Sequence, residues 1–146
     1  MLIRPIEKRD RDEYIKMAKD FYSSPVVLHP IPDENFENTF NELMERDTYA
    51  QCFIFEEAEA ITGYALIAIT FSQEAGGLVV WIEEIHVKEE YRGKGAGSAF
   101  FDFLHGKFGD RVKRFRLEVE EENEKAVKLY KSLGYEFFGY DQMVRE

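Results

Sequence analysis

The chain is 146 residues long, and 45% of its residues are hydrophobic and 33% are charged. This size and apolar share predict a single domain over residues 1–146 that folds without a disulfide or a structural metal. The formal net charge of −10 argues against a nucleic-acid partner, because binding to a phosphate backbone requires a basic face.

The cysteine content and the apolar runs of the sequence indicate the cellular compartment of the protein. Cys52 is the single cysteine, so we expect no internal disulfide and no metal site. No apolar run approaches the roughly 18 residues of a membrane span, and the first residues lead directly into charged sequence. We therefore expect a cytoplasmic protein without a membrane partner. Its acidic surface either attracts cationic small molecules, such as polyamines or aminoglycosides, or only keeps the protein soluble.

The first third of the chain predicts one strand and two helices. A short strand is expected at Leu2 to Ile6, and apolar residues at helical spacing predict a helix from about Lys8 to Tyr22. Three prolines in Ser23 to Pro32 exclude a long regular element there. Asp33 can then cap a second helix, whose apolar residues are Phe36, Phe40, Leu43 and Met44.

The middle of the chain is rich in β-forming residues. Strands are expected at Ala50 to Phe55, Ala60 to Phe71 and Leu78 to Val87. The segments between them, Glu57 to Glu59 and Glu74 to Gly77, carry turn residues. The spacing therefore predicts two consecutive hairpins.

The last third returns to alternating helices and strands. A helix is expected from Gly95 to about Phe108, and clean alternation predicts a strand at Arg114 to Glu120. Asn123 caps a helix through Leu133, which Gly134 ends in a left-handed conformation. Tyr135 to Val144 is expected to be a last strand, and its exposed edge could pair across a homodimer.

This order of elements predicts an α/β fold of mixed α+β character. The link from the Leu78 strand through the Gly95 helix to the Arg114 strand should be a right-handed parallel crossover, whereas the hairpins before it are antiparallel. We therefore expect a central mixed, mostly antiparallel sheet flanked by about four helices.

The run from Tyr91 to Ser98 ends an apolar strand and opens an amphipathic helix. Helix N-termini carry unpaired backbone N–H groups and the positive end of the macrodipole, and glycines let an anion approach them closely. Arg92 and Lys94 add positive charge. The run therefore predicts a phosphate-binding turn, and the alternative is a merely flexible connection.

The same run resembles the pyrophosphate-binding Arg-x-x-Gly-x-Gly motif of the GCN5-related N-acetyltransferases (GNAT), matched here by Arg92, Gly95 and Gly97. The order of elements is similar to that of this family over essentially the whole chain. The resemblance implies a GNAT-like fold whose parallel strand pair splays apart to admit acetyl-coenzyme A (acetyl-CoA) as cosubstrate. It implies that the pyrophosphate is held by Arg92, Gly93, Lys94, Gly95, Ala96, Gly97 and Ser98.

Two further segments resemble signatures of the family. The strand before the loop resembles the one whose backbone pairs with the pantetheine arm, which implies main-chain contacts from Ile85, His86 and Val87. A backbone N–H near Val87 is the expected donor to the thioester oxygen. The helix that begins at Asn123 resembles the second signature, which implies that Asn123 bonds the pantetheine and that Ala126 is small enough to admit it.

Acetyl transfer to an amine also needs a proton acceptor and a proton donor. An alkylamine with a pKa of about 10.4 is almost entirely protonated at neutral pH. Some family members carry an acidic residue at the Glu83 position, so Glu83 is the expected general base and Glu84 the second candidate. Neighbouring strand residues point to opposite faces unless a bulge intervenes, so at most one of the two should face the acceptor. The alternative is a polar strand edge.

Tyr130 is the expected proton donor to the leaving thiolate. It lies seven residues after Asn123, nearly two helical turns, so both share one helix face. Its hydroxyl has an ordinary pKa of about 10. The alternative is an aromatic side chain that only packs in the core.

The acceptor side is expected in the segment between the first two helices. Tyr22, Leu28 and His29 should line it together with Glu83, or they only pack beneath the loop. Cys52 lies in an apolar strand without a neighbouring histidine, so we expect direct attack in a ternary complex.

Three functions remain open at this point. The first is N-acetylation of a primary amine of a small molecule. The second is acetylation of a protein N-terminus or lysine, and the third is non-catalytic sensing of acyl-CoA.

Overall fold

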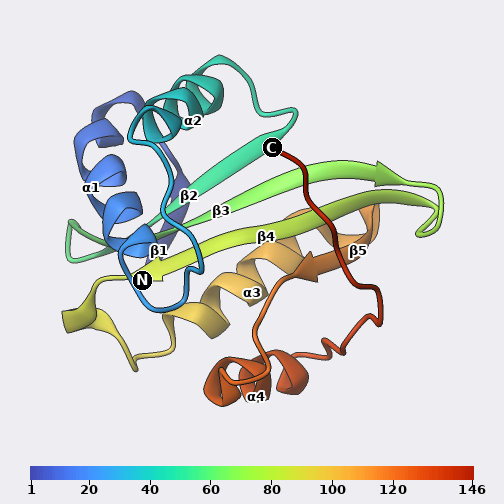
Figure 1. Ribbon diagram of the computed structural model, residues 1–146. Helices are drawn as coiled ribbons and strands as arrows, with labels where there is room; N and C mark the ends of the chain where they lie inside the picture. Colours follow the sequence, from blue (N-terminus) through green and yellow to red (C-terminus); the bar gives the residue numbers. More distant parts are fainter.

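The computed structural model describes residues 1–146 and shows a five-stranded sheet with helices packed on both faces (Figure 1). This architecture confirms the mixed α+β fold with about four helices. None of the helices has the length and apolar character that crossing a membrane would require. In chain order the elements are β1 (Leu2–Pro5), α1 (Arg11–Tyr22), α2 (Glu34–Glu45), β2 (Ala50–Glu57), β3 (Ala60–Ser72), β4 (Gly77–Val87), α3 (Ala96–Phe108), β5 (Val112–Leu117) and α4 (Glu124–Ser132).

The sheet has the strand order β1-β2-β3-β4-β5. Neighbouring strands are antiparallel except for β4 and β5, which are parallel, as the crossover through α3 predicts. The parallel pairing runs only from Leu78↔Val112 to Ile82↔Leu117, while β4 continues to Val87. The two strands therefore separate, and Figure 1 shows β5 turning away from β4 toward α4.

Two hydrophobic cores fill the two faces of the sheet. Alternation along β2 sends Phe53 and Phe55 to the α3 side and Cys52 and Ile54 to the side of α1 and α2. On the α3 side the core is completed by Ala65, Ile67, Val80, Ile82, Phe100, Phe101, Leu104, Phe108 and Val112. On the other side it is completed by Tyr14, Met17, Ala18, Phe36, Phe40, Tyr64 and Leu66.

Local signals fix most helix ends where the sequence predicts them. Asn123 caps α4 by accepting a hydrogen bond from the Ala126 N–H at 3.4 Å. Gly134 follows α4 with a φ of 91°, the left-handed conformation that favours glycine. Asp33 occupies the N-cap position of α2, but its side chain makes no capping hydrogen bond. The first helical segment is divided, because Lys8–Asp10 forms a single 3₁₀ turn ahead of α1.

The predicted last strand at Tyr135 to Val144 is wrong. These residues have no regular secondary structure, and β5 is the edge strand on this side of the sheet. Gly134 and Gly139 both adopt positive φ, which breaks the extended conformation that a strand needs. The segment instead returns past β5 (Figure 1), and side-chain contacts hold it there. Its contacts are Tyr140 Oη to Glu74 Oε2 at 3.1 Å, Gln142 Nε2 to Glu118 Oε2 at 3.1 Å, and Phe138 beneath the guanidinium groups of Arg114 and Arg116.

Arg4 on β1 ties the sheet to the start of α1. Its guanidinium donates to both oxygens of Asp10, at 2.7 and 2.9 Å, and pairs with Glu56 on β2 at 2.6 Å. Asp10 is 2% exposed and also accepts the N–H of Glu7 at 2.7 Å. Burial alone would raise the pKa of Asp10, but the bonds from Arg4 and Glu7 outweigh it and hold the pKa below its usual value.

Candidate active site

The separation of β4 and β5 creates the candidate site. The last paired residues are Ile82 and Leu117, so Glu83 and Glu118 come next on two parallel strands that are beginning to part. Beyond this point the outer edge of β4 has no neighbouring strand. Beyond Ile82 the backbone of Ile85–Val87 pairs with no strand on this side, although the Val87 carbonyl accepts a hydrogen bond from Arg92. The resemblance implies that this edge pairs with an extended ligand.

A β-bulge lies at Glu83. Leu66 of β3 pairs with Glu84 and Ile67 pairs with Ile82, so Glu83 is the extra residue that has no partner. A bulge interrupts the alternation of a strand, and Glu84 accordingly points to the face of α1 and α2, opposite to Ile82. Simple alternation would place Glu83 and Glu84 on opposite faces of the sheet. The bulge breaks this alternation between the two glutamates.

Glu84 is buried and held by two tyrosines. It is 8% exposed, and it accepts the hydroxyl of Tyr64 on Oε1 at 2.6 Å and the hydroxyl of Tyr22 on Oε2 at 2.8 Å. Burial raises its pKa, while the two hydroxyl donors act in the opposite direction. No cation pairs with this carboxylate. It is a fixed group whose two oxygens are both occupied.

Glu83 is the accessible member of the pair. Its side chain is exposed and makes no hydrogen bond or ion pair with the protein. Its pKa is raised, first by loss of hydration among the surrounding atoms and then by the charges of Glu118 and Glu84. A carboxylate that is free to reach a ligand and has a raised pKa is suited to accept a proton near neutral pH.

The glycine loop leads directly into α3. Gly93 and Gly95 have φ values of 77° and 84°, and Gly95 is the N-cap residue of the helix. No side chain caps α3, and its first turn contains no acidic residue. The leading N–H groups therefore lack side-chain acceptors, as an anion-binding helix N-terminus requires. On these observations the loop fits the pyrophosphate of a CoA ligand.

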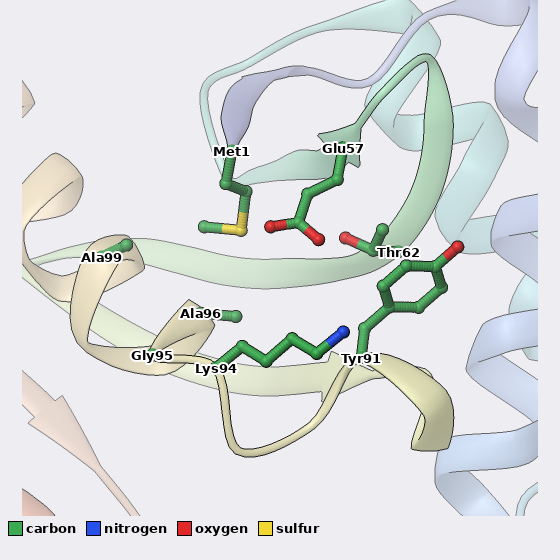
Figure 2. Close-up of a pocket in the computed structure, with 8 residues that line it drawn as sticks. All are labelled: Met1, Glu57, Thr62, Tyr91, Lys94, Gly95, Ala96 and Ala99. Carbon is green, nitrogen blue, oxygen red and sulfur yellow. The ribbon is translucent and has the colours of Figure 1, made fainter.

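The two cationic side chains of the loop make contacts of their own. Arg92 donates from Nε to the carbonyl of Val87 at 2.7 Å, which closes the end of β4. The Lys94 ammonium lies 5.5 Å from the centre of the Tyr91 ring. Figure 2 shows the Lys94 side chain in a cavity of about 160 Å³. The residues that line this cavity are Met1, Glu57, Thr62, Tyr91, Lys94, Gly95, Ala96 and Ala99.

Tyr130 on α4 lines a larger cleft of about 1020 Å³ between β5, α4 and the C-terminal segment. Its half-buried ring packs edge-on against Phe101 at 5.7 Å, and its hydroxyl makes no hydrogen bond with the protein. Burial raises the pKa of Tyr130, so the hydroxyl keeps its proton at neutral pH. The cleft is of the size that ligand sites reach.

The predicted acceptor residues do not all come together. Tyr22 contacts Glu84, as described, but Leu28 and His29 are exposed in the connection between α1 and α2 and make no hydrogen bond. The His86 imidazole is buried on the α1 and α2 face against Tyr64, at 5.9 Å between ring centres. Burial lowers the pKa of His86, so this ring is packed and neutral near physiological pH.

Two residues of this region were missed by the sequence reasoning. Tyr64 is the second donor to Glu84, and its place opposite His86 depends on a strand register that the sequence does not reveal. Glu118 follows the last paired residue of β5 and raises the pKa of Glu83. A charged residue directly after a parallel strand was the signal that could have identified it.

A mixed sheet that opens between its two parallel strands, beside an uncapped helix N-terminus, is the architecture of an α+β acetyltransferase domain. The chain belongs to the acetyltransferase (GNAT) family, whose sequence profile matches residues 12–135.

Individual relatives agree with this assignment. A thialysine N-epsilon-acetyltransferase from Sus scrofa is 38% identical over 79 residues, which are 53% of this chain and 46% of the relative. The match thus spans about half the length of the curated relative. A possible acetyltransferase from Clostridium difficile 630 superimposes with a TM-score of 0.86 at 20% identity, over 99% of this chain and 96% of the other. AAC(6')-Iy in complex with a bisubstrate analogue gives a TM-score of 0.80 at 18% identity, over 99% and 97%. At these identities the two structures establish the shared fold.

Proposed function

We propose that this protein transfers an acetyl group from acetyl-CoA to a primary amine of a small molecule. The observation that carries the proposal is the parting of β4 and β5 directly before Glu83. It leaves an unpaired strand edge, a glycine loop at a helix N-terminus and an accessible carboxylate beside one another along β4 and its continuation. The family membership and the relative named for an amine nitrogen of thialysine support the same chemistry.

Acetyl-CoA would be held along the edge of β4 and at the start of α3. The N–H groups of Gly95, Ala96, Gly97 and Ser98 would bind the pyrophosphate, with Arg92 and Lys94 nearby, while Ile85–Val87 would pair with the pantetheine. Asn123 and Ala126 of α4 would contact the pantetheine from the other side of the opening. The cosubstrate supplies the acetyl thioester.

Replacing Gly97 with alanine should weaken CoA binding by about tenfold or more without destabilising the protein. Gly97 has no positive φ, and a Cβ there would meet only Leu129 Cδ2, at an ordinary 3.8 Å. Alanine favours helix over glycine by up to about 1 kcal/mol. A loss of affinity would therefore report close approach of the ligand. Titration calorimetry with CoA and urea unfolding measure the two quantities.

Gly106 provides the matched control for this substitution. It lies exposed in the same helix, and nothing lies within 4 Å of a Cβ built there. Gly106→Ala should leave CoA affinity unchanged and keep or raise stability. Equal CoA affinity in the Gly97→Ala variant would show that the ligand does not approach α3 at this residue.

Glu83 would accept the proton that the acceptor must lose. The acceptor ammonium first loses one proton to Glu83, directly or through water, and Glu83 passes this proton to solvent. The neutral amine nitrogen then forms a bond to the acetyl carbon, the carbon–sulfur bond breaks, and the thiolate leaves. The second amine proton passes to Glu83 in the same way, and Tyr130 donates its hydroxyl proton to the thiolate. Both groups then return to their starting states by exchange with water.

Replacing Tyr130 with phenylalanine should lower kcat by roughly 10² and leave the KM for acetyl-CoA nearly unchanged. The ring and its packing on Phe101 are retained, so only the proton donor is lost. The estimate is the lower end of the range for general acid–base catalysis, because water can reach a half-buried hydroxyl. Initial rates of thiol release at saturating acceptor measure the effect.

Tyr135 is the control for this variant. Its ring packs against Tyr130 at 6.2 Å, and its hydroxyl lies 3.2 Å from Nε2 of His105. Tyr135→Phe should turn over at nearly the normal rate. Normal turnover in Tyr130→Phe would remove Tyr130 from the mechanism and leave it as a packing residue.

The acceptor is proposed to be a small cationic amine. Two carboxylates, Glu83 and Glu118, follow the last paired residues at the opening, Glu84 is buried next to Glu83, and the whole chain carries a net charge of −10. Cationic amines are drawn to such a surface. A thiol-release assay with acetyl-CoA should compare thialysine, lysine, polyamines and aminoglycosides with peptides that carry a free N-terminus or a lysine side chain.

The same assay separates the alternative functions. Activity on small amines supports the proposal, and activity restricted to peptides would replace it with protein acetylation. CoA binding without thiol release to any amine would indicate an acyl-CoA sensor. Burial raises the pKa of the Cys52 thiol well above its usual value, so an acetyl-cysteine step is disfavoured and initial-rate lines should intersect rather than run parallel.

A further inference from the structure

The hydroxyls of Tyr22 and Tyr64 occupy the two oxygens of one buried carboxylate. Tyr22 is the last residue of α1 and Tyr64 lies in β3, so Glu84 of β4 is held from two different elements. An ionised carboxylate that is buried without a cation needs such donors to remain charged. The two hydroxyl bonds thus favour the ionised form of Glu84 and oppose the burial that raises its pKa.

That charge lies next to Glu83 because of the bulge in β4. Glu84 pairs with Leu66, whereas Glu83 has no partner in β3. The two carboxylates repel each other, and only Glu84 has hydrogen-bond donors that stabilise its ionised form, so in this inference Glu84 is the first of the two to lose its proton. At the pH where Glu83 titrates, its neighbour is already negative.

We propose that Tyr22 and Tyr64 are positioning residues for acetyl transfer, because they hold Glu84 as a charged carboxylate that makes its neighbour Glu83 a stronger base. This inference rests on the proposed function in one respect, the assignment of Glu83 as the proton acceptor. Neither tyrosine is required to touch the acceptor. The two tyrosines act on Glu84, Glu84 acts on Glu83, and Glu83 accepts the proton.

The sign of the effect distinguishes this role from simple packing. Removal of one hydroxyl leaves a buried oxygen of Glu84 without a donor, so Glu84 binds a proton and becomes neutral. Glu83 then loses the repulsion, and its pKa falls. The acidic limb of the pH–rate profile, where Glu83 becomes protonated, must move to lower pH. Loss of a neutral hydroxyl would thus change the titration of a group that it does not contact.

Other titratable groups around the two carboxylates do not reverse this sign. The Cys52 thiol and the Tyr14 hydroxyl, both buried, have pKa values raised by burial and stay neutral. The His86 ring is neutral near physiological pH, and Glu118 adds to the repulsion at Glu83 in the protein and in its variants alike. The titratable groups that interact with Glu83 or Glu84 include Tyr14 and Tyr22 from α1, Cys52 from β2, Tyr64 from β3 and Glu118 after β5. The His86 ring packs against Tyr64 and faces the charges of Arg92, Asp20 and Lys88.

The test is a pH titration of the glutamate carboxyl carbons by ¹³C NMR. The Glu83 signal is identified by its absence in Glu83→Gln. In Tyr22→Phe and in Tyr64→Phe the Glu83 midpoint should fall by about one pH unit, the size expected for removal of one nearby charge. Glu84→Gln should produce the same fall, and Tyr22→Phe added to Glu84→Gln should produce no further change. The acidic limb of the thiol-release profile should move in the same direction.

Tyr14 supplies the matched control. It is as buried as Tyr64, its ring lies 5.3 Å from that of Tyr64, and its hydroxyl donates no hydrogen bond to Glu84. Tyr14→Phe should leave the Glu83 midpoint in place. A Glu83 midpoint that stays or rises in Tyr22→Phe, Tyr64→Phe and Glu84→Gln overturns the inference, and so does an equal fall in Tyr14→Phe.

The NMR midpoint does not depend on turnover, so the two proposals can fail separately. If the midpoint falls but no amine is acetylated, the proposed function is wrong and the electrostatic coupling stands without its role in catalysis. If amines are acetylated and the midpoint does not move, the proposed function stands and the role of the two tyrosines is wrong.

Discussion

Replacing Glu83 with glutamine should lower kcat by about 10²- to 10⁴-fold and abolish the acidic limb of the pH–rate profile. The amide keeps the size of the side chain but cannot accept a proton, and proton removal from an alkylammonium is a large part of the barrier at neutral pH. The raised pKa of Glu83 sets the sign: the active, ionised form is lost as the pH falls through that pKa. Thiol release measured across pH at saturating acceptor checks both results.

Glu118→Gln is the control for this substitution. It removes a carboxylate from the same opening, yet it should retain turnover, because Glu118 only repels the charge on Glu83. The acidic limb of this variant should move to lower pH, since loss of the repulsion lowers the pKa of Glu83. An unchanged rate and an unchanged limb in Glu83→Gln would remove Glu83 from the mechanism and leave Glu84 as the remaining candidate.

Much of the fold was predictable because its signals are local. Alternation and turn residues located both hairpins, and Asn123 and Gly134 marked the two ends of α4 as the structure has them. The predicted strand at Tyr135 to Val144 failed for a reason that is not local. Whether an aromatic segment becomes a strand depends on pairing with β5, and here side-chain contacts of Phe138, Tyr140 and Gln142 hold it instead.

Only those parts of the candidate site that lie within a recognisable sequence motif were predictable. The glycine loop and the Asn123 helix could be located by resemblance, because backbone geometry at a phosphate site constrains the sequence. The arrangement around Glu83 could not, since one unpaired residue in the β3–β4 register reverses the side of the sheet that every later side chain faces. Tyr64 became part of the site only once that register was known, whereas Glu118 follows from the place where the pairing of β4 and β5 ends.

Replacing Asp10 with alanine should lower the free energy of unfolding by about 3 kcal/mol, near the lower end for a broken buried ion pair. The variant leaves Arg4, whose side chain is 13% exposed, with Glu56 as its remaining partner and also removes the acceptor for the Glu7 N–H. Because α1 begins at this contact and ends at Tyr22, the loss should weaken the element that carries one of the two donors to Glu84. Urea unfolding at pH 7 measures the difference.

The difference in free energy of unfolding between the protein and Asp10→Ala should depend on pH, because its origin is electrostatic. The pKa of Asp10 is lowered in the folded protein, so its stabilisation is present above the unfolded value of about 3.9 and is lost as the pH falls through the folded pKa. The gap between the protein and Asp10→Ala should therefore shrink in acid. Asp12, an exposed residue of the same helix that pairs only with Arg11, is the control, and Asp12→Ala should change stability by less than about 1 kcal/mol. A gap for Asp10→Ala that stays constant down to acidic pH would mean that lost packing, and not the ion pair with Arg4, is what the substitution removes.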